Sequence, residues 1–250
     1  MDISKYIDYT LLRPTATERD IIELCQKAKQ QDYYSVCING AYLALAKEIL
    51  TESDIKLCSV VGFPFGSAST SSKVYEAKKA VFDGADEIDM VINIGYLKSR
   101  NYVSVLKDIS EVKTAIGDIP LKVILEISEL NKNEIIRACE ICLDAKADFI
   151  KTSTGFSKSG ATLTAIKIIK KTIRNKAKIK ASGGISDFET ALKYIDAGAD
   201  RIGTSSTIKS KLNKRQVRNT KIYKKYIETV VKKDESSNVE TSTDRKTTLH

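Results

Sequence analysis

The sequence predicts an α/β protein built as a single (β/α)8 TIM barrel with a basic C-terminal extension. Three observations support this prediction: the chain has 250 residues, short β-rich runs alternate with longer helical segments, and eight such runs can be counted. A doubly wound open sheet is the alternative fold. That fold usually has a G-x-G-x-x-G turn after its first strand, and no such turn follows residues 7–10, so the barrel is favoured.

Turn residues bound each expected strand, and segments with a helical apolar period lie between them. The expected strands are residues 7–10, 35–38, 57–62, 87–93, 121–127, 148–153, 178–182 and 201–203. The expected helices include residues 18–31, 74–83, 102–116, 132–146, 164–174 and 187–197. Three strands follow one cassette, Gly84-Ala85-Asp86, Lys146-Ala147-Asp148 or Gly198-Ala199-Asp200, in which glycine or lysine ends a helix. This repetition supports the count of units.

Charge is distributed unevenly along the chain. The net charge is +9, and residues 207–250 hold 12 Lys and Arg against 5 Asp and Glu, which leaves 29 against 27 for residues 1–206. We expect the barrel domain with a basic C-terminal helix to span residues 1–231, and residues 232–250 to form a polar, disordered tail. A charged terminal run is usually only solvated, so binding of nucleic acid or protein by this tail is disfavoured but left open.

The remaining composition excludes several classes of protein. No run approaches the ~18 to 20 apolar residues of a membrane span, and the first residues lack the apolar stretch of a secretory signal. The five cysteines are odd in number and irregularly spaced, which argues against a disulfide framework and favours a cytoplasmic protein. Cys139 and Cys142 lie in a helical pattern and are expected in the core. The single histidine is His250, so no histidine base and no metal site is expected.

The segment with the clearest chemical signal is the strand around Lys151. Strand alternation puts Phe149, Lys151 and Ser153 on one face. If that face is the barrel interior, the ammonium is partly desolvated and becomes a usable nucleophile toward a carbonyl group. The next strand carries Lys180, also central and also followed by a serine two residues on. Two neighbouring cations disfavour each other's charge, so one can attack as a free amine while the other stays protonated.

Carboxylates are then needed beside the two lysines, to hold an ammonium and to move protons. Alternation along residues 87–93 puts Asp89 on the face opposite the apolar set of Ile88, Met90 and Ile92, which should pack beneath the helices. Asp89 is therefore expected in the interior. Asp8 is a second candidate, with a smaller share in the mechanism because it can also pair structurally with a lysine.

Two glycine- and serine-rich turns point to a phosphate group. Ser182-Gly183-Gly184-Ile185 follows the seventh strand and Ile202-Gly203-Thr204-Ser205-Ser206 the eighth, where barrel enzymes frequently hold phosphate on backbone N–H groups. Gly155, after the sixth strand, can join them. Each glycine alone is explained equally well by a need for positive φ. Turns of this composition after consecutive strands favour a phosphorylated ligand.

At these residues the chain resembles the deoxyribose-phosphate aldolase family of class I, metal-free aldolases. The resemblance runs from Ile7 to about Ser206 and is carried by six blocks in order: IDYTLLRP (7–14), VVGFP (60–64), GADEIDMVINIG (84–95), FIKTSTGF (149–156), KASGGI (180–185) and RIGTS (201–205). It implies cleavage of 2-deoxy-D-ribose 5-phosphate to D-glyceraldehyde 3-phosphate and acetaldehyde in deoxynucleoside catabolism, without a cofactor. It also implies a homodimer.

Carried over by position, the resemblance makes Lys151 the Schiff-base nucleophile, with Asp89 and Lys180 exchanging protons through a bound water. The phosphate contacts it implies are Gly155, Gly183, Gly184, Ser205 and Ser206, and it puts Asp8, Thr10 and Cys37 around the mouth of the site. The chain departs from the family at Tyr9, Arg13, Gly40 and Ser71-Ser72, and it ends in His250 where some relatives end in a tyrosine that assists proton transfer. These departures lie outside the lysine pair.

Two other interpretations compete with this one. Another Schiff-base or phosphate-binding barrel is the nearest enzyme, because one fold supports many chemistries. The set of Lys151, Lys180 and Asp89 disfavours it. A barrel that has lost catalysis and serves as an interaction protein is the alternative from a different class, and the presence of both lysines argues against it.

Overall fold

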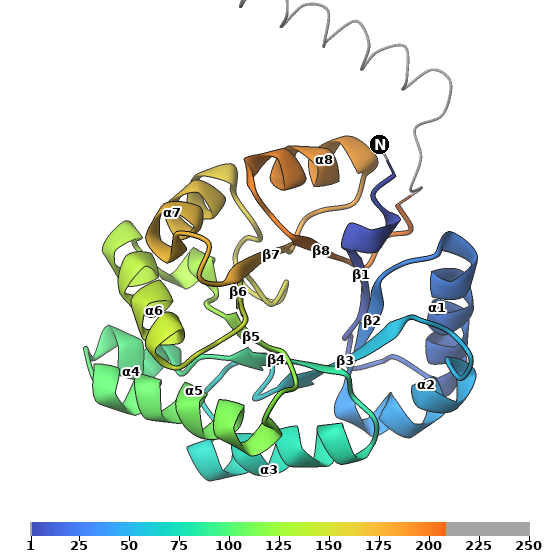
Figure 1. Ribbon diagram of the computed structural model, residues 1–250, viewed down its shortest axis with the longest axis horizontal. Helices are drawn as coiled ribbons and strands as arrows, with labels where there is room; N and C mark the ends of the chain where they lie inside the picture. The colour runs from blue at the N-terminus through green and yellow to red at the C-terminus, as the bar shows by residue number, and fades with distance from the viewer. Residues whose placement is uncertain (1, 209–250) are drawn as a thin grey trace, which may run out of the picture. The chain divides into compact units, whose positions relative to one another are not determined.

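The computed structural model describes residues 2–208, and within them eight parallel strands close into a barrel in chain order, with β8 pairing to β1. Figure 1 looks along the barrel, with the strands around the centre and the helices outside them. The predicted (β/α)8 barrel is confirmed. The expected basic helix up to residue 231 and the tail of 232–250 lie outside the described residues. No helix among residues 2–208 is long and apolar enough to cross a membrane.

The strands are short and the helices between them longer, as the sequence pattern predicts. The strands are β1 (Ile7–Leu11), β2 (Ser35–Ile38), β3 (Lys56–Val61), β4 (Glu87–Val91), β5 (Leu121–Ile124), β6 (Phe149–Lys151), β7 (Lys178–Ser182) and β8 (Arg201–Thr204). The α-helices are α1 (Glu18–Gln31), α2 (Leu43–Ile49), α3 (Thr70–Phe82), α4 (Ile94–Lys98), α5 (Tyr102–Ile116), α6 (Lys132–Asp144), α7 (Leu163–Ile173) and α8 (Phe188–Ala197). Short 3₁₀ helices cover Ser4–Tyr6, Gly40–Tyr42 and Ile127–Glu129.

The helix α3 begins at Thr70, four residues before the expected start, because Ser69 caps it by accepting a hydrogen bond from the Ser72 N–H. Among the strands, the largest differences occur where a strand leaves the sheet. β4 ends at Val91 rather than residue 93, because Asn93 caps α4 by accepting a hydrogen bond from the Tyr96 N–H at 3.0 Å. β5 ends at Ile124 rather than 127, because Glu126 turns the chain with a φ of 56°. The helices α2 and α4 were not among the expected segments. They have seven and five residues, too few to show an apolar period.

The repeated cassette before β4, β6 and β8 has a structural explanation. Its first residue takes a left-handed conformation, with φ of 103° at Gly84, 59° at Lys146 and 111° at Gly198, and so ends the preceding helix. Its aspartate then accepts a hydrogen bond from the first or second N–H of the preceding strand. The pairs are Asp86 with Leu57, Asp148 with Leu121 and Asp200 with Ile179, each at 2.8 Å. The cassette thus ties each strand start to its neighbour at the N-terminal end of the barrel.

The helices bury apolar faces against the outside of the barrel. In α6, Ile135, Ala138, Cys139 and Cys142 are buried, which confirms that the two cysteines belong to the core. Outward-facing Ile88 and Met90 of β4 are fully buried beneath the helices, as alternation predicts. The same alternation turns Asp89, between them, into the barrel interior.

Candidate active site

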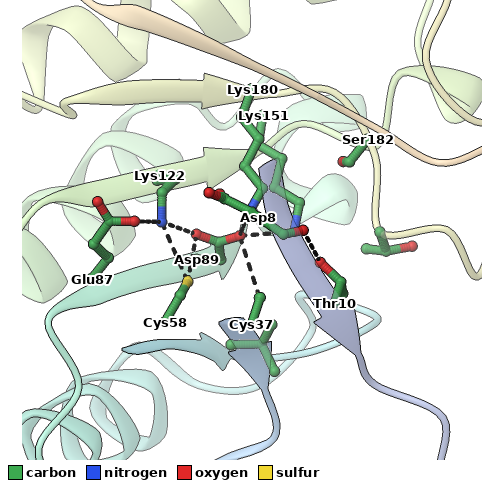
Figure 2. A network of polar contacts seen from close by, with 12 residues as sticks. Asp8, Thr10, Cys37, Cys58, Glu87, Asp89, Lys122, Lys151, Lys180 and Ser182 are labelled. Carbon is green, nitrogen blue, oxygen red and sulfur yellow. Dashed lines mark hydrogen bonds and ion pairs between the residues drawn. The ribbon is translucent and has the colours of Figure 1, made fainter. Parts of the chain in front are cut away.

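Asp89 lies at the centre of a buried cluster of charged side chains inside the barrel. Its Oδ2 accepts hydrogen bonds from the Nζ atoms of Lys151 and Lys180, each at 2.8 Å, and its Oδ1 accepts one from Lys122 Nζ at 2.7 Å. These residues come from β4, β6, β7 and β5, and Figure 2 shows their side chains converging on one carboxylate. The side chain of Asp89 is fully buried, and Lys151 is 2% exposed.

The other charged residues complete a closed ring around this centre. Lys180 Nζ lies 2.6 Å from Asp8 Oδ2, and Lys122 Nζ lies 2.8 Å from Glu87 Oε2. Arg201 closes the ring, with nitrogens 3.0 Å from Asp8 Oδ1 and 3.4 Å from Glu87 Oε1. Three cations therefore alternate with three carboxylates, in the order Asp8, Lys180, Asp89, Lys122, Glu87 and Arg201.

Lys151 is the one basic group of this cluster that stands outside the ring. Each cation of the ring lies within 4 Å of two carboxylates, whereas among residues 2–208 Lys151 pairs with Asp89 alone. The cluster holds four basic groups against three carboxylates, so its charge balances when one of the four is a neutral amine. Lys151 makes the fewest ion pairs of the four, and it is also the lysine of this cluster that lines the cavity described below.

The electrostatics of the ring favour its charged forms. Burial opposes the charge of Lys180, but Asp8 and Asp89 outweigh it and raise the pKa of Lys180 well above its ordinary value of 10.5. Burial likewise opposes the charge of Asp89, and Lys122, Lys151 and Lys180 together hold the pKa of that carboxyl well below 3.8. Lys180 therefore stays an ammonium at neutral pH, beside an ionised Asp89.

Two thiols pack against the same carboxylate. Cys58 Sγ lies 3.1 Å from Asp89 Oδ1 and 3.3 Å from Lys122 Nζ, and Cys37 Sγ lies 3.9 Å from Asp89 Oδ2. Of the described residues, only Cys37, Cys58 and Asp89 bring three possible metal ligands within 4.8 Å of one another. The side-chain nitrogens of three lysines already contact the oxygens of Asp89, and two of these lysines, Lys122 and Lys180, also pair with further carboxylates. The arrangement therefore does not suit a bound cation.

A cavity of ≈ 450 Å³ opens above Lys151 at the C-terminal ends of the strands. It is lined by residues from the ends of β1, β6, β7 and β8 and from the turns after them: Thr10, Leu11, Leu12, Arg13, Lys151, Thr154, Gly155, Phe156, Ser182, Gly183, Gly184, Ile185, Ser186, Gly203, Thr204, Ser205 and Ser206. All five residues predicted to contact phosphate are among them. Gly183 also needs to be glycine for space, because a Cβ there would lie 2.7 Å from the Cα of Gly160.

The positions of Asp8 and Cys37 differ from the expectation. Thr10 lines the cavity, whereas Asp8 and Cys37 are fully buried and do not. Asp8 is the second residue of β1 and so lies deeper than Thr10, whose side chain projects from the same face one layer higher. Asp8 and Cys37 therefore belong beneath the cavity, against the charged cluster, rather than around its mouth.

The sequence analysis missed Lys122, Glu87 and Arg201 as members of the cluster. Lys122 had a signal related to that of Lys151, because it is a lysine in an apolar strand, but it lies near the start of residues 121–127 and not at their centre. Glu87 lies two residues before Asp89, so alternation puts it on the same face, but nothing in the sequence pointed to a role for it. Arg201 opens β8, where an arginine is commonly solvated, and only the closed barrel brings it to Asp8 and Glu87.

We expect Lys122→Met to destabilise the protein by about 3–5 kcal/mol, because Glu87 and Asp89 would each lose a buried partner. Urea unfolding followed by circular dichroism measures this loss. Lys113→Met is the matched control, since Lys113 pairs with the half-exposed Asp148 and should cost only about 0–1 kcal/mol. Equal losses in the two variants would contradict the structural role given to Lys122.

Asp8 gives the ring a defined dependence on pH. Burial alone would raise its pKa, but Lys180, Lys122 and Arg201 lower it to about 2 from 3.8. Asp8 thus contributes stability above pH 3.8 that is lost as the pH falls toward 2, amounting to about 2 kcal/mol at neutral pH. We expect the difference in unfolding free energy between wild type and Asp8→Asn to shrink as the pH falls from 5 to 2.5. A difference that stays constant over this range would show that Asp8 does not titrate there.

The chain matches the DeoC/LacD family of aldolases over residues 3–210. It is 52% identical over 209 residues to a deoxyribose-phosphate aldolase from Finegoldia magna, which covers 84% of this chain and 98% of the relative. It is 50% identical over 206 residues to one from Mycoplasma capricolum subsp. capricolum, which covers 82% of this chain and 93% of that relative.

Solved structures agree with these sequence matches. The aldolase QR15 superposes with a TM-score of 0.80 at 46% identity, over 82% of this chain and 92% of its own. A tetrameric deoxyribose phosphate aldolase from Aeropyrum pernix gives 0.76 at 31% identity, over 83% of this chain and 88% of its own. By its sequence and by its fold, the chain belongs to the DeoC/LacD family of aldolases.

Proposed function

We infer that this protein is a class I aldolase that reversibly cleaves 2-deoxy-D-ribose 5-phosphate to D-glyceraldehyde 3-phosphate and acetaldehyde, in the catabolism of deoxyribose phosphate. Curated relatives at 50% and 52% identity are deoxyribose-phosphate aldolases that match this chain over 93% and 98% of their length. The observation that carries the mechanism is Lys151, which stands outside a balanced ring of charges and faces the cavity.

The chemistry begins at the Nζ of Lys151. The neutral amine adds to the aldehyde carbon of the open-chain sugar, and loss of water gives a protonated Schiff base. The iminium then accepts the electron pair of the C2–C3 bond as that bond breaks. The C3 hydroxyl loses its proton at the same time, which releases D-glyceraldehyde 3-phosphate and leaves an enamine on Lys151.

The second half of the reaction needs a proton at C2. Asp89 and Lys180 are suited to exchange it, since Lys180 remains an ammonium and its Nζ is 2.8 Å from the Asp89 oxygen that also contacts Lys151. Protonation at C2 restores an iminium, and water adds to it and expels acetaldehyde. The proton taken from the C3 hydroxyl can return to C2 through the same pair of groups, directly or through water.

The phosphate end of the substrate fits the glycine and serine turns. Five residues of these turns line the cavity, and their backbone N–H and hydroxyl groups are suited to hold a phosphate: Gly155, Gly183, Gly184, Ser205 and Ser206. Asp8 is a member of the ring and Cys37 contacts Asp89, both below the reacting carbon. Thr10 lines the cavity. Each of these roles is part of the proposal.

The test is an assay with 2-deoxyribose 5-phosphate that follows both products, acetaldehyde by alcohol dehydrogenase and the triose phosphate by its own dehydrogenase. We expect the two products in equal amounts, and no effect of a chelator. A folded protein that forms neither product would contradict the proposed reaction. Cleavage of another phosphorylated sugar instead would favour a different Schiff-base aldolase.

The proposal extends to assembly and location. A homodimer is proposed on the base rate for soluble enzymes, and one relative is a tetramer. Light scattering of the full chain separates these states from a monomer. A cytoplasmic location is proposed because the five cysteines are free and buried in reduced form.

A further inference from the structure

Glu126 is a buried acidic residue that the mechanism above does not use. It follows β5, is 3% exposed, and has φ of 56° and ψ of 65°, a left-handed conformation that costs a residue other than glycine free energy. The backbone around it is fixed on both sides, because the N–H groups of Leu125 and Ile127 donate to the carbonyls of Lys151 and Thr152 at 3.0 Å. β6 therefore holds Glu126 in this strained conformation.

The carboxyl of Glu126 is directed at the turn that follows Lys151. Its Oε2 accepts a hydrogen bond from the Thr154 N–H at 3.3 Å and a short one from the Thr154 hydroxyl. The Thr154 hydroxyl oxygen in turn accepts from the Phe156 N–H at 3.0 Å. Glu126 thus holds Thr154 directly and Phe156 through the Thr154 hydroxyl, at the two ends of a three-residue turn. The middle residue of this turn, Gly155, has a φ of 88° and lines the cavity.

Within the part of the chain that the structure describes, the second carboxyl oxygen of Glu126 lacks the hydrogen bond that a buried polar atom in a protein core usually makes. Glu126 Oε1 is buried and has no hydrogen-bond partner among the described residues. A buried, unpaired oxygen costs free energy. Burial raises the pKa of Glu126 above its ordinary value of 4.5, against the lowering effect of Thr154, which eases this cost by favouring the neutral acid.

The residues just before this turn form hydrogen bonds with β7. The Ser182 N–H donates to the Thr152 hydroxyl at 3.0 Å, and the Ser182 hydroxyl donates to the Ser153 carbonyl at 2.6 Å. Residues 151–153 are therefore fixed by β7, whereas Thr154 is held by Glu126 and Phe156 by the Thr154 hydroxyl. Removing the Glu126 carboxyl should release Gly155 and leave Lys151 in place.

We propose that Glu126 is a positioning residue for the phosphate end of the cavity, which orients the Thr154–Phe156 turn so that the backbone of Gly155 meets the substrate phosphate. The inference rests on the proposed function for the identity of the phosphate ester. It assigns Glu126 no contact with the substrate and no part in proton transfer. Its effect is on the binding of the phosphate group and not on bond cleavage at Lys151.

The test compares 2-deoxyribose 5-phosphate with unphosphorylated 2-deoxyribose. We expect Glu126→Ala to raise KM for the phosphate ester about tenfold with kcat changed less than about threefold, and to leave kcat/KM for the free sugar within about twofold. Glu126→Gln keeps an oxygen that can accept from Thr154 and should restore wild-type KM. Thr154→Val removes the hydroxyl that joins Glu126 to the Phe156 N–H, so this variant alone should also raise KM for the phosphate ester.

Glu129→Ala is the matched control. Glu129 lies in the same loop and contacts Ser157 and Lys158, which lie beyond the cavity lining, so both sugars should react as with wild type. Circular dichroism and thermal melts confirm that each variant is folded. Equal losses of kcat/KM for both sugars, no change in Glu126→Ala, or a Glu126→Gln variant as impaired as Glu126→Ala would each overturn the inference.

Binding of inorganic phosphate gives a readout that does not depend on turnover. Calorimetry with the full chain should show Kd for inorganic phosphate about tenfold higher in Glu126→Ala than in wild type or Glu126→Gln. If wild type cleaves neither sugar but this difference in Kd is found, the proposed function fails and the role of Glu126 stands. If wild type is active and the Kd values are equal, the proposed function stands and the role of Glu126 fails.

Discussion

Lys151→Met should lose turnover by roughly 10⁴-fold or more while remaining folded. Methionine keeps the length and most of the apolar stem of lysine but has no amine, so no Schiff base can form. The fold should persist because Asp89 keeps Lys122 and Lys180 as partners. The substitution also leaves three basic groups against the three carboxylates of the cluster. The rate of acetaldehyde release, with unfolding in urea as the check on folding, measures both parts of this prediction.

Lys180→Met is the control that separates the two lysines. It retains the Lys151 amine but opens the ring, since Asp8 and Asp89 each lose a partner. We expect it to be slow but still able to form a covalent adduct at residue 151. An active Lys151→Met variant, or an inactive Lys151→Met variant that still forms an adduct at Lys180, would reverse the assignment of roles.

Asp89→Asn should be the most damaging isosteric change in the barrel interior. It leaves Lys122, Lys151 and Lys180 around a neutral amide, and removing one partner of a buried ion pair costs about 3–5 kcal/mol. Turnover should also fall by about 10²–10⁴-fold, because the amide cannot exchange protons with Lys180 or the substrate. Urea unfolding and steady-state kinetics at a temperature where the variant is folded measure the two effects separately.

Asp108→Asn provides the matched comparison for Asp89→Asn. Asp108 is buried and pairs with the buried Lys73 at 2.6 Å, but this pair lies between α3 and α5 and not in the charged cluster. It should lose stability on a similar scale and keep turnover close to wild type. If Asp108→Asn loses as much turnover as Asp89→Asn, the loss reflects general destabilisation and not proton transfer by Asp89.

Strand alternation was sufficient to predict the face on which the reacting groups lie. Alternation assigned Asp89 to the interior and put Lys151 on one face with Phe149 and Ser153, and Lys180 was expected beside Lys151 because it is central in the next strand. The structure brings both lysines to the Asp89 carboxylate. The glycine turns were found because composition alone marks them, and they line the cavity. Both signals are local, and the parallel barrel brings successive strand ends together by its topology.

The depth of a side chain along the barrel axis, and the residue with which it pairs, could not be predicted from these local signals. Alternation gives the face of a side chain but not its layer, so it could not correct the family resemblance, which put Asp8 and Cys37 at the mouth, whereas they lie beneath the cavity. The ion pairs that Lys122, Glu87 and Arg201 make within the ring join strands that are far apart in sequence, and their distances depend on barrel closure. The strained conformation of Glu126 had no sequence signal, because glycine or asparagine is the residue expected at positive φ.

The most direct test of the mechanism is to trap the intermediate. The protein is incubated with 2-deoxyribose 5-phosphate, reduced with borohydride, digested and analysed by mass spectrometry, with Lys151→Met treated in parallel. The charge balance around Lys151 predicts a reduced two-carbon or sugar adduct on Lys151 that is absent from the variant. Folded wild-type protein without any adduct would contradict the Schiff-base mechanism, and an adduct on Lys180 would contradict the assignment of the free amine to Lys151.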